Sequence, residues 1–144
     1  MTVLDKDLTR LLEAYQKAAF DKDVDAFMRL YDPKVRIFDT WGVWVYDGAE
    51  AWQRAVEGWF TGLGTERVKV RFDDVQALAG KDLSSLSAIV TYAAVAAEGT
   101  PQLRAMQNRI SWVLRTSGHV PRIVHEHTSA PVGFDDAKAI LVRA

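Results

Sequence analysis

The sequence contains no cysteine among its 144 residues. This absence excludes disulfide bonds, zinc sites built from thiolates, and catalytic thiol nucleophiles. The sequence also has no long apolar run: the longest, residues 88–97, includes Thr91 and Tyr92 and is too short to span a bilayer. The N-terminus carries acidic side chains and no apolar signal segment. We therefore expect a cytoplasmic protein without a membrane partner.

Neither sign of charge predominates in the chain. Lysine and arginine together number 18, aspartate and glutamate 19, and the net charge is −1. This balance lacks the basic character of nucleic-acid-binding proteins, so no nucleic-acid partner is expected. Apolar residues make up 49% and charged residues 26%, which is typical of a globular protein. The length favours one domain, with a core at about residues 5–131 and a tail at 132–144.

The N-terminal half has helical periodicity. Apolar residues recur at intervals of three and four over residues 4–20 and 51–60, and each series forms one stripe of an amphipathic helix. A shorter helix is expected to begin after Asp23 and to include Tyr31. It must end before Pro33, because a proline disfavours the helical conformation of the residue before it. The tail, at 134–142, is expected to form one or two helical turns.

The C-terminal half has strand character. Strands are predicted at 68–78, 85–98, 103–115 and 122–129, after an earlier hairpin at 35–46. Strands that follow helices indicate an α+β fold rather than a parallel βαβ sheet. We expect three helices packed on a curved, mostly antiparallel sheet of about five to six strands, with a cavity between the two layers.

The long strands are apolar on both faces. In the strand predicted at 103–115, Ile110 and Trp112 lie on one face and Leu103 and Val113 on the other. An antiparallel sheet with one solvated face should alternate between apolar and polar residues, so something is expected to cover the second face. We predict a homodimer through the convex face of the sheet.

Residues 99–131 form the most distinctive stretch of the sequence. Its elements are the Gly99-Thr100-Pro101 turn, Gln107 with Arg109, and the run Val124-His125-Glu126-His127-Thr128-Ser129-Ala130-Pro131. The stretch resembles the C-terminal half of SnoaL-like proteins in the nuclear-transport-factor-two-like superfamily. Within that group it is most similar to the association domain of calcium/calmodulin-dependent protein kinase type II. The resemblance implies a cystatin-like cone with a pocket between the helices and the concave sheet face.

The histidines of this run are candidate pocket residues. Strand alternation puts His125 and His127 on one face with Ile123, and Glu126 on the other. We predict that both imidazoles point into the cavity together with Arg109 and bind a small molecule, such as an anion or carboxylate. The alternatives are two structural histidines and, for Arg109, an internal salt bridge to Asp39 or Glu126. No metal is predicted, because the pair lacks an evident third ligand.

A second group of candidates comes from the hairpin at 35–46. In ketosteroid-isomerase-like relatives an aspartate in an apolar cavity abstracts a proton and a tyrosine binds the resulting enolate. The resemblance assigns these catalytic roles to Asp39 and Tyr46, with Asp39 as a turn residue as the alternative. Trp41 and Trp44 are predicted to form the pocket wall.

Three functions remain open on this basis, and none requires a cofactor. The first is binding of a small molecule by a SnoaL-like domain. The second is an isomerase, cyclase or dehydratase that acts next to a carbonyl group. The third is a homo-oligomeric assembly module without a working pocket.

Overall fold

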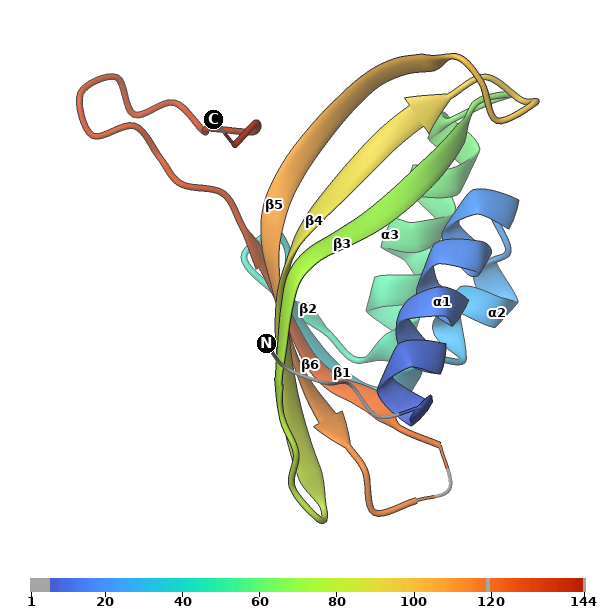
Figure 1. Cartoon of the computed structure of the whole chain (residues 1–144), viewed down its shortest axis with the longest axis vertical. Coiled ribbons are helices and arrows are strands. Elements are labelled where there is room, and N and C mark those ends of the chain that lie inside the picture. Colours follow the sequence, from blue (N-terminus) through green and yellow to red (C-terminus); the bar gives the residue numbers. More distant parts are fainter. Residues whose placement is uncertain (1–5, 119, 144) are drawn as a thin grey trace.

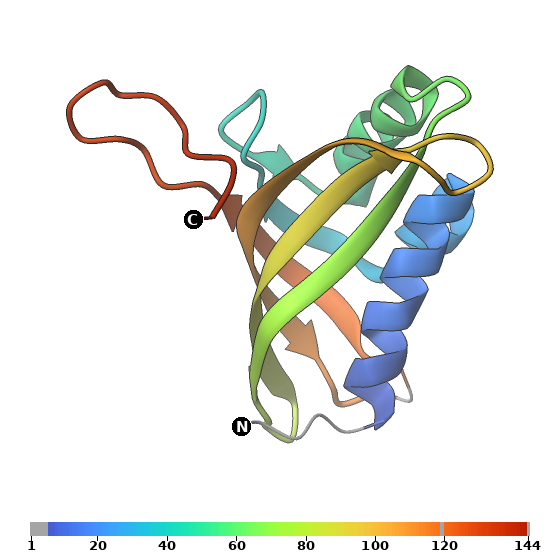
Figure 2. The same ribbon diagram turned by 45° about the horizontal axis from the view of Figure 1, so that its top comes forward.

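The fold is a curved six-stranded sheet with three helices on its concave side (Figures 1 and 2). The computed structural model describes residues 6–118 and 120–143, so the predicted start of the core at residue 5 lies outside the described part. The helices are α1 (Lys6–Asp21), α2 (Val24–Met28) and α3 (Ala49–Gly62). The strands are β1 (Tyr31–Phe38), β2 (Tyr46–Asp47), β3 (Arg67–Leu78), β4 (Leu83–Val95), β5 (Gln102–Arg115) and β6 (Arg122–Ser129).

The strand order is β2-β1-β6-β5-β4-β3, and only the β1–β6 pair is parallel among the described strands. The predicted α+β class with a mostly antiparallel sheet is therefore confirmed. Register shifts interrupt β3, the β4–β5 pair and the β5–β6 pair. Such bulges bend and twist a sheet locally, which explains how strands this long curve around the helices.

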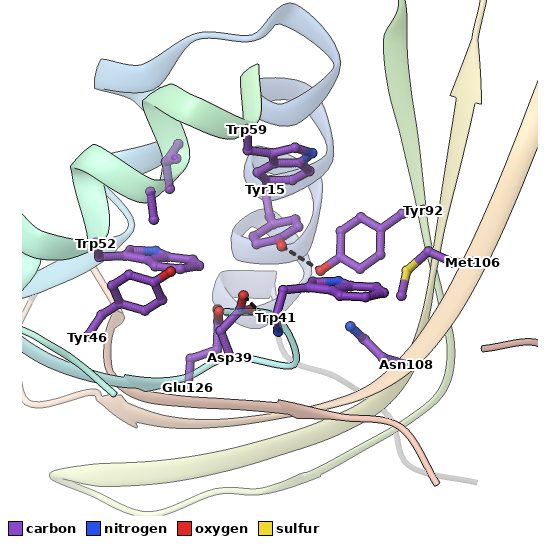
Figure 3. Close-up of a pocket in the computed structure, with 12 residues that line it drawn as sticks. Tyr15, Asp39, Trp41, Tyr46, Trp52, Trp59, Tyr92, Met106, Asn108 and Glu126 are labelled. Carbon is purple, nitrogen blue, oxygen red and sulfur yellow. Dashed lines mark hydrogen bonds between the residues drawn. The ribbon is translucent and has the colours of Figure 1, made fainter. Parts of the chain in front are cut away.

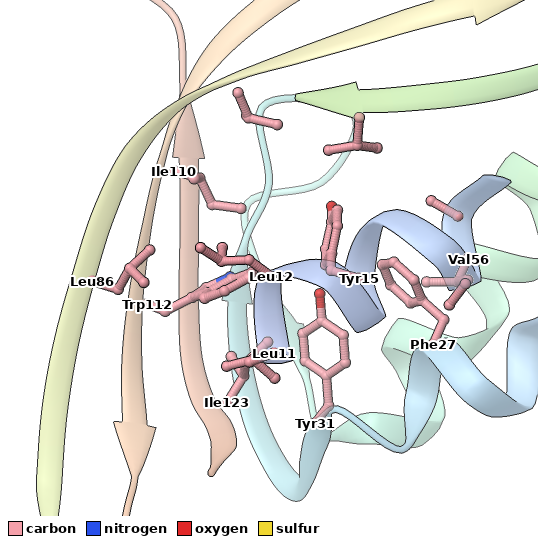
Figure 4. Packing of buried hydrophobic residues seen from close by; sticks show 14 of the residues in the cluster. Leu11, Leu12, Tyr15, Phe27, Tyr31, Val56, Leu86, Ile110, Trp112 and Ile123 are labelled. Carbon is pink, nitrogen blue, oxygen red and sulfur yellow. The ribbon is translucent and has the colours of Figure 1, made fainter. Parts of the chain in front are cut away.

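The helices bury the stripes that the sequence predicts. In α1 the buried side chains include Leu8, Leu11 and Tyr15. The Tyr15 ring packs against Trp112 of β5 with a centroid distance of 5.7 Å (Figure 4). Asp23 caps α2 by accepting a hydrogen bond from the Ala26 backbone N–H at 3.0 Å. This helix ends earlier than predicted, because the chain next enters the sheet: Tyr31 begins β1 and is paired with β6.

One bulge in β6 decides which side chains face the helices. Val113 is paired with His125, but Leu114 is paired with Ile123, so Val124 is an extra residue in β6. Regular alternation therefore holds on each side of Val124 but not across it. The consequence is that Ile123 and Glu126, three positions apart, are both buried on the concave side.

The tail does not form the predicted helical turns. Residues 130–143 make an irregular hairpin that projects from the outer, convex side of the sheet (Figures 1 and 2). An isolated bridge joins Val132 and Ala139, and the chain returns to β5, where the Gln107 N–H donates to the Leu141 carbonyl. None of the described helices is long and apolar enough to cross a membrane.

Candidate functional site: an aromatic pocket with two carboxyl groups

A cavity of about 380 Å³ lies between the helices and the concave face of the sheet (Figure 3). Side chains from α1, α3, four strands (β2, β4, β5 and β6) and the loop after β1 contribute to its wall. The lining residues are Tyr15, Asp39, Trp41, Tyr46, Trp52, Ala55, Val56, Trp59, Tyr92, Met106, Asn108 and Glu126. Its size is in the range of pockets that bind small organic molecules.

Aromatic rings form most of the apolar wall. Trp52 and Trp59 project from α3 and contact the rings of Tyr46 and Tyr92, with centroid distances of 5.3 Å and 5.8 Å. The hydroxyl groups of Tyr15 and Tyr92 form a hydrogen bond of 2.8 Å across the pocket. Burial is the main cause that raises the pKa of both these tyrosines, so they remain neutral donors and acceptors at physiological pH.

Glu126 places a carboxyl group at the floor of the pocket. Its side chain is 2% exposed, and its Oε1 accepts hydrogen bonds from the Tyr31 hydroxyl at 2.7 Å and the Trp112 indole N–H at 2.9 Å. Burial raises the pKa of Glu126 from 4.5 to about 7; the charge of Asp39 acts in the same direction, and the two hydrogen bonds oppose it. Near neutral pH this group can therefore accept or release a proton.

Asp39 brings a second carboxyl group to the same end of the pocket (Figure 3). Its Oδ1 accepts from the Thr128 hydroxyl at 3.1 Å, and its Oδ2 accepts from the Trp41 backbone N–H at 3.3 Å. Partial burial raises the pKa of Asp39, while these hydrogen bonds lower it. The pocket thus holds two carboxyl groups whose proton affinities are set by different surroundings.

Two buried polar atoms of the lining lack a hydrogen-bond partner among the described residues. They are Trp52 Nε1, a donor, and Asn108 Oδ1, an acceptor. Both side chains lie in the pocket wall. Burial raises the pKa of the Tyr31 hydroxyl, and the Trp52 indole lies near enough to lower it, so the indole has a neighbour in the protein. Buried polar groups are nearly always paired, so a ligand in the pocket is the natural partner for Asn108 Oδ1.

A family model described as a SnoaL-like domain matches residues 8–133. The chain belongs to the SnoaL-like domain family. This match confirms the family predicted from the C-terminal motif, and the chain has no match among curated proteins.

Solved structures share the fold of this SnoaL-like domain at low sequence identity. An NTF2-like protein of unknown function from Pseudomonas putida KT2440 has a TM-score of 0.80 at 20% identity, over 95% of this chain and 93% of that one. A putative calcium/calmodulin-dependent protein kinase II association domain from Xanthomonas campestris has a TM-score of 0.73 at 17% identity, over 90% and 89% of the two chains. The β subunit of benzoate 1,2-dioxygenase from Burkholderia mallei ATCC 23344 has a TM-score of 0.72 at 16% identity, over 90% and 92%.

Three of the residues predicted from sequence line the pocket of this SnoaL-like domain. They are Asp39, Trp41 and Tyr46. Trp44 is outside the lining and its side chain is 95% exposed, so its predicted place in the wall is wrong. The catalytic roles of Asp39 and Tyr46 stay predictions.

The prediction that His125, His127 and Arg109 point into the cavity is wrong. The bulge at Val124 turns both histidines to the outer face, where their rings contact Phe38 at centroid distances of 5.0 Å and 5.5 Å. His125 Nδ1 also hydrogen-bonds the Arg36 carbonyl at 2.7 Å. This bond joins β6 to β1, so the geometry of His125 fits the alternative interpretation of a structural histidine.

Arg109 is exposed on the same outer face, because it lies one residue from the buried Asn108 in β5. Its Nε donates to Ser129 Oγ at 3.1 Å. The alternative salt bridge to Asp39 or Glu126 is therefore wrong as well. Among the described residues, no group of three or more His, Asp or Glu side chains is arranged to hold a metal ion.

Some of the pocket residues that the sequence analysis missed have a signal in the sequence that could have identified them, and others do not. Trp52 and Trp59 are seven residues apart in a helix, which puts them on one face and could have identified them. Asn108 interrupts the apolar series Met106, Ile110, Trp112 and Leu114 on one face of β5, which is also a usable signal. Glu126 gave a misleading signal, because its side depends on the bulge.

Proposed function

We propose that this SnoaL-like domain binds a small, neutral ring compound in the pocket between its helices and sheet. The observation that carries the proposal is an open cavity of about 380 Å³ with aromatic walls and a few convergent polar groups. Aromatic side chains favour stacking or edge contacts with flat rings. The open cavity also favours binding over an assembly role alone, because a module without a ligand has no need of an unfilled core.

The charge of the lining favours a neutral ligand over the anion first expected. The lining contains Asp39 and Glu126, and no lysine, arginine or histidine is among its residues in the part of the chain that the structure describes. A carboxylate ligand would lose its hydration and meet like charges without a cationic partner. A ligand with a hydroxyl group could instead donate to the unpaired carbonyl oxygen of Asn108.

Binding of 2-naphthol, compared with 2-naphthoate as its anionic counterpart, tests this proposal by tryptophan fluorescence. We expect 2-naphthol to bind and 2-naphthoate to bind at least about tenfold more weakly. Ala55→Phe should abolish binding, because it fills the cavity; Ala51→Phe, on the same helix but outside the lining, should preserve it. Equal binding of the two compounds, or binding unaffected by Ala55→Phe, would contradict the proposal.

The second candidate is proton transfer at a carbon next to a carbonyl group, as in ketosteroid-isomerase-like enzymes. The specific observation is the Glu126 carboxyl, whose pKa near 7 suits a general base or acid at neutral pH. Asp39 lies at the same end of the pocket, and Tyr46 is within its lining. One carboxyl would remove the proton, and a neutral donor would stabilise the enolate.

Deuterium exchange of 2-tetralone in D₂O, followed by NMR, tests this activity directly. We expect the wild-type protein to accelerate exchange at the carbons next to the carbonyl, and Glu126→Gln to slow it by about 100-fold. His127→Gln, on the outer face, is the control and should leave the rate unchanged. Exchange no faster than in buffer would remove the enzymatic candidate and leave the binding proposal standing.

A further inference from the structure

A chain of four polar side chains runs from Asp39 to Asn108 along the pocket. The Thr128 hydroxyl donates to Asp39 Oδ1 at 3.1 Å, and the Thr40 hydroxyl donates to Thr128 Oγ1 at 3.0 Å. The Asn108 side-chain amide then donates to Thr40 Oγ1 at 3.3 Å. The two ends, Asp39 and Asn108, are both in the pocket lining (Figure 3). The hydroxyls therefore connect two groups that a ligand would touch.

The direction of every hydrogen bond in the chain follows from an ionised Asp39. A carboxylate can only accept, so the Thr128 proton must point to it. Thr128 Oγ1 then accepts from both the hydroxyl and the backbone N–H of Thr40, the latter at 2.8 Å. Because the Thr40 proton is used in this way, its oxygen accepts from the Asn108 amide nitrogen. The carbonyl oxygen of Asn108, a residue of the pocket lining, is left unpaired among the described residues.

When Asp39 is protonated, every hydrogen bond in the chain can run in the opposite direction. The carboxylic acid donates to Thr128 Oγ1, Thr128 donates to Thr40 Oγ1, and Thr40 donates to the Asn108 carbonyl after a half-turn of the amide. The backbone N–H of Thr40 keeps its bond to Thr128 throughout. The chain keeps the same number of hydrogen bonds, and the Asn108 NH₂ group takes the place of its carbonyl oxygen as the group left for the ligand.

We propose that Asn108 selects the polar group of the ligand, and that Thr40 and Thr128 couple the orientation of the Asn108 amide to the protonation state of Asp39. The inference deepens the proposed function, because it concerns the ligand of the same pocket. With Asp39 ionised, Asn108 accepts from a ligand hydroxyl or N–H. With Asp39 protonated, Asn108 donates to a ligand carbonyl.

The other titratable groups around Asp39 come from four elements. Glu126 in β6 interacts with it electrostatically, and Tyr46 in β2, Tyr92 in β4 and Tyr15 in α1 share the lining. Helix α3 contributes only Trp52, Ala55, Val56 and Trp59, none of which titrates. Glu126→Gln removes the one other acid in this set, so that Asp39 titrates alone.

Selective ¹⁵N labelling makes the proposal measurable, because Asn108 is the only asparagine in the sequence. In the Glu126→Gln protein, we expect the Asn108 NH₂ signals to shift with pH at the same midpoint as the Asp39 carboxyl carbon. Thr40→Val should abolish this shift, since valine keeps the shape and removes the hydroxyl, while Asp39 should still titrate.

Thr91→Val is the matched control. Thr91 accepts from the Gln107 side-chain amide at 3.0 Å, a second threonine–amide pair that is separate from the chain at Asp39. This variant should leave the Asn108 titration unchanged. Should Thr40→Val not fold, Thr128→Val breaks the same chain and should abolish the amide shift while raising the pKa of Asp39, because it removes a hydrogen bond to the carboxylate.

Two results would overturn the proposal: Asn108 signals that do not move with pH, or a shift of undiminished size in Thr40→Val and Thr128→Val. The measurement needs no ligand. It can therefore succeed where 2-naphthol fails to bind, or fail where 2-naphthol binds, and the two proposals are tested separately.

Discussion

The concave and convex faces of the sheet are built from alternate residues of the same strands, yet their chemistry is opposite. The concave face buries Glu126 and Asn108 among aromatic rings and leaves an open pocket. The convex face carries Arg36, Arg109 and His127, which are exposed to solvent. The role of a residue in this sheet therefore depends on the face on which it lies. In β6 that face is set by one extra residue, Val124.

Removing the inserted residue is the strongest test of this comparison. Deletion of Val124 restores regular alternation through β6, so either Ile123 or the pair Glu126 and Thr128 must leave the concave side. We expect a loss of at least about 3 kcal/mol in the free energy of unfolding, because a buried hydrogen-bonded network or a core side chain is lost. Urea denaturation measures it.

Val124→Ala is the control for this deletion. It shortens the side chain but keeps the number of residues in β6, so the bulge is preserved. A cost of about 1 kcal/mol is expected. Equal costs for the deletion and the substitution would show that the bulge does not set the faces.

The same bulge explains which features of the fold and the pocket could be predicted from the sequence and which could not. Helical stripes and the strands of the C-terminal half were predictable, because each rests on a local apolar period that the core then buries, as in α1. Asp39 and Tyr46 could be placed near a cavity mouth from the resemblance alone. Glu126 could not, since its face depends on an extra residue in the pairing of β6 with β5, and the residue types of β6 give no signal of that bulge.

The second prediction concerns the pH dependence of stability, which the raised pKa of Glu126 on the concave face should produce and the convex face should not. Folded Glu126 keeps its proton up to about pH 7, whereas the unfolded chain loses it near 4.5. The native state therefore binds more protons in this interval, and stability falls as pH rises through it. The loss should be on the order of 3 kcal/mol. Glu126→Gln, which still accepts from Tyr31 and Trp112, should remove it.

Urea denaturation of the wild-type protein and Glu126→Gln between about pH 5 and pH 8 gives the difference directly. His127→Gln serves as the convex-face control and should follow the wild-type curve. Parallel curves for the wild type and Glu126→Gln would mean that Glu126 is not the group that titrates.

The third prediction concerns what covers the convex face. The arm at residues 130–143 projects on this side, and its Phe134 side chain is fully exposed at 101%. Asp135 lies next to Phe134, and the convex face carries Arg36 and Arg109, so the charges are complementary. We expect a second copy of the chain to pack here, with each arm against the other sheet.

Light scattering at micromolar concentration should give the mass of a dimer. Phe134→Asp should shift it toward the monomer, because it places a charge in the expected contact. Trp44→Asp is the control, since Trp44 is equally exposed but belongs to the loop beside the pocket. A monomeric wild-type protein would rule out this assembly.

The smallest effect is expected at the histidines that the sequence made most conspicuous. His127 is exposed, and its ring contacts Phe38 rather than the pocket. His127→Gln should change the free energy of unfolding by no more than about 0.5 kcal/mol, because surface substitutions without a buried partner cost little. It should also leave the affinity for 2-naphthol unchanged, whereas Asn108→Leu should weaken it, since Asn108 lies in the lining with an unpaired oxygen. A fluorescence titration in which His127→Gln weakens binding as much as Asn108→Leu would mean that the convex face communicates with the pocket, and the separation of the two faces would then fail.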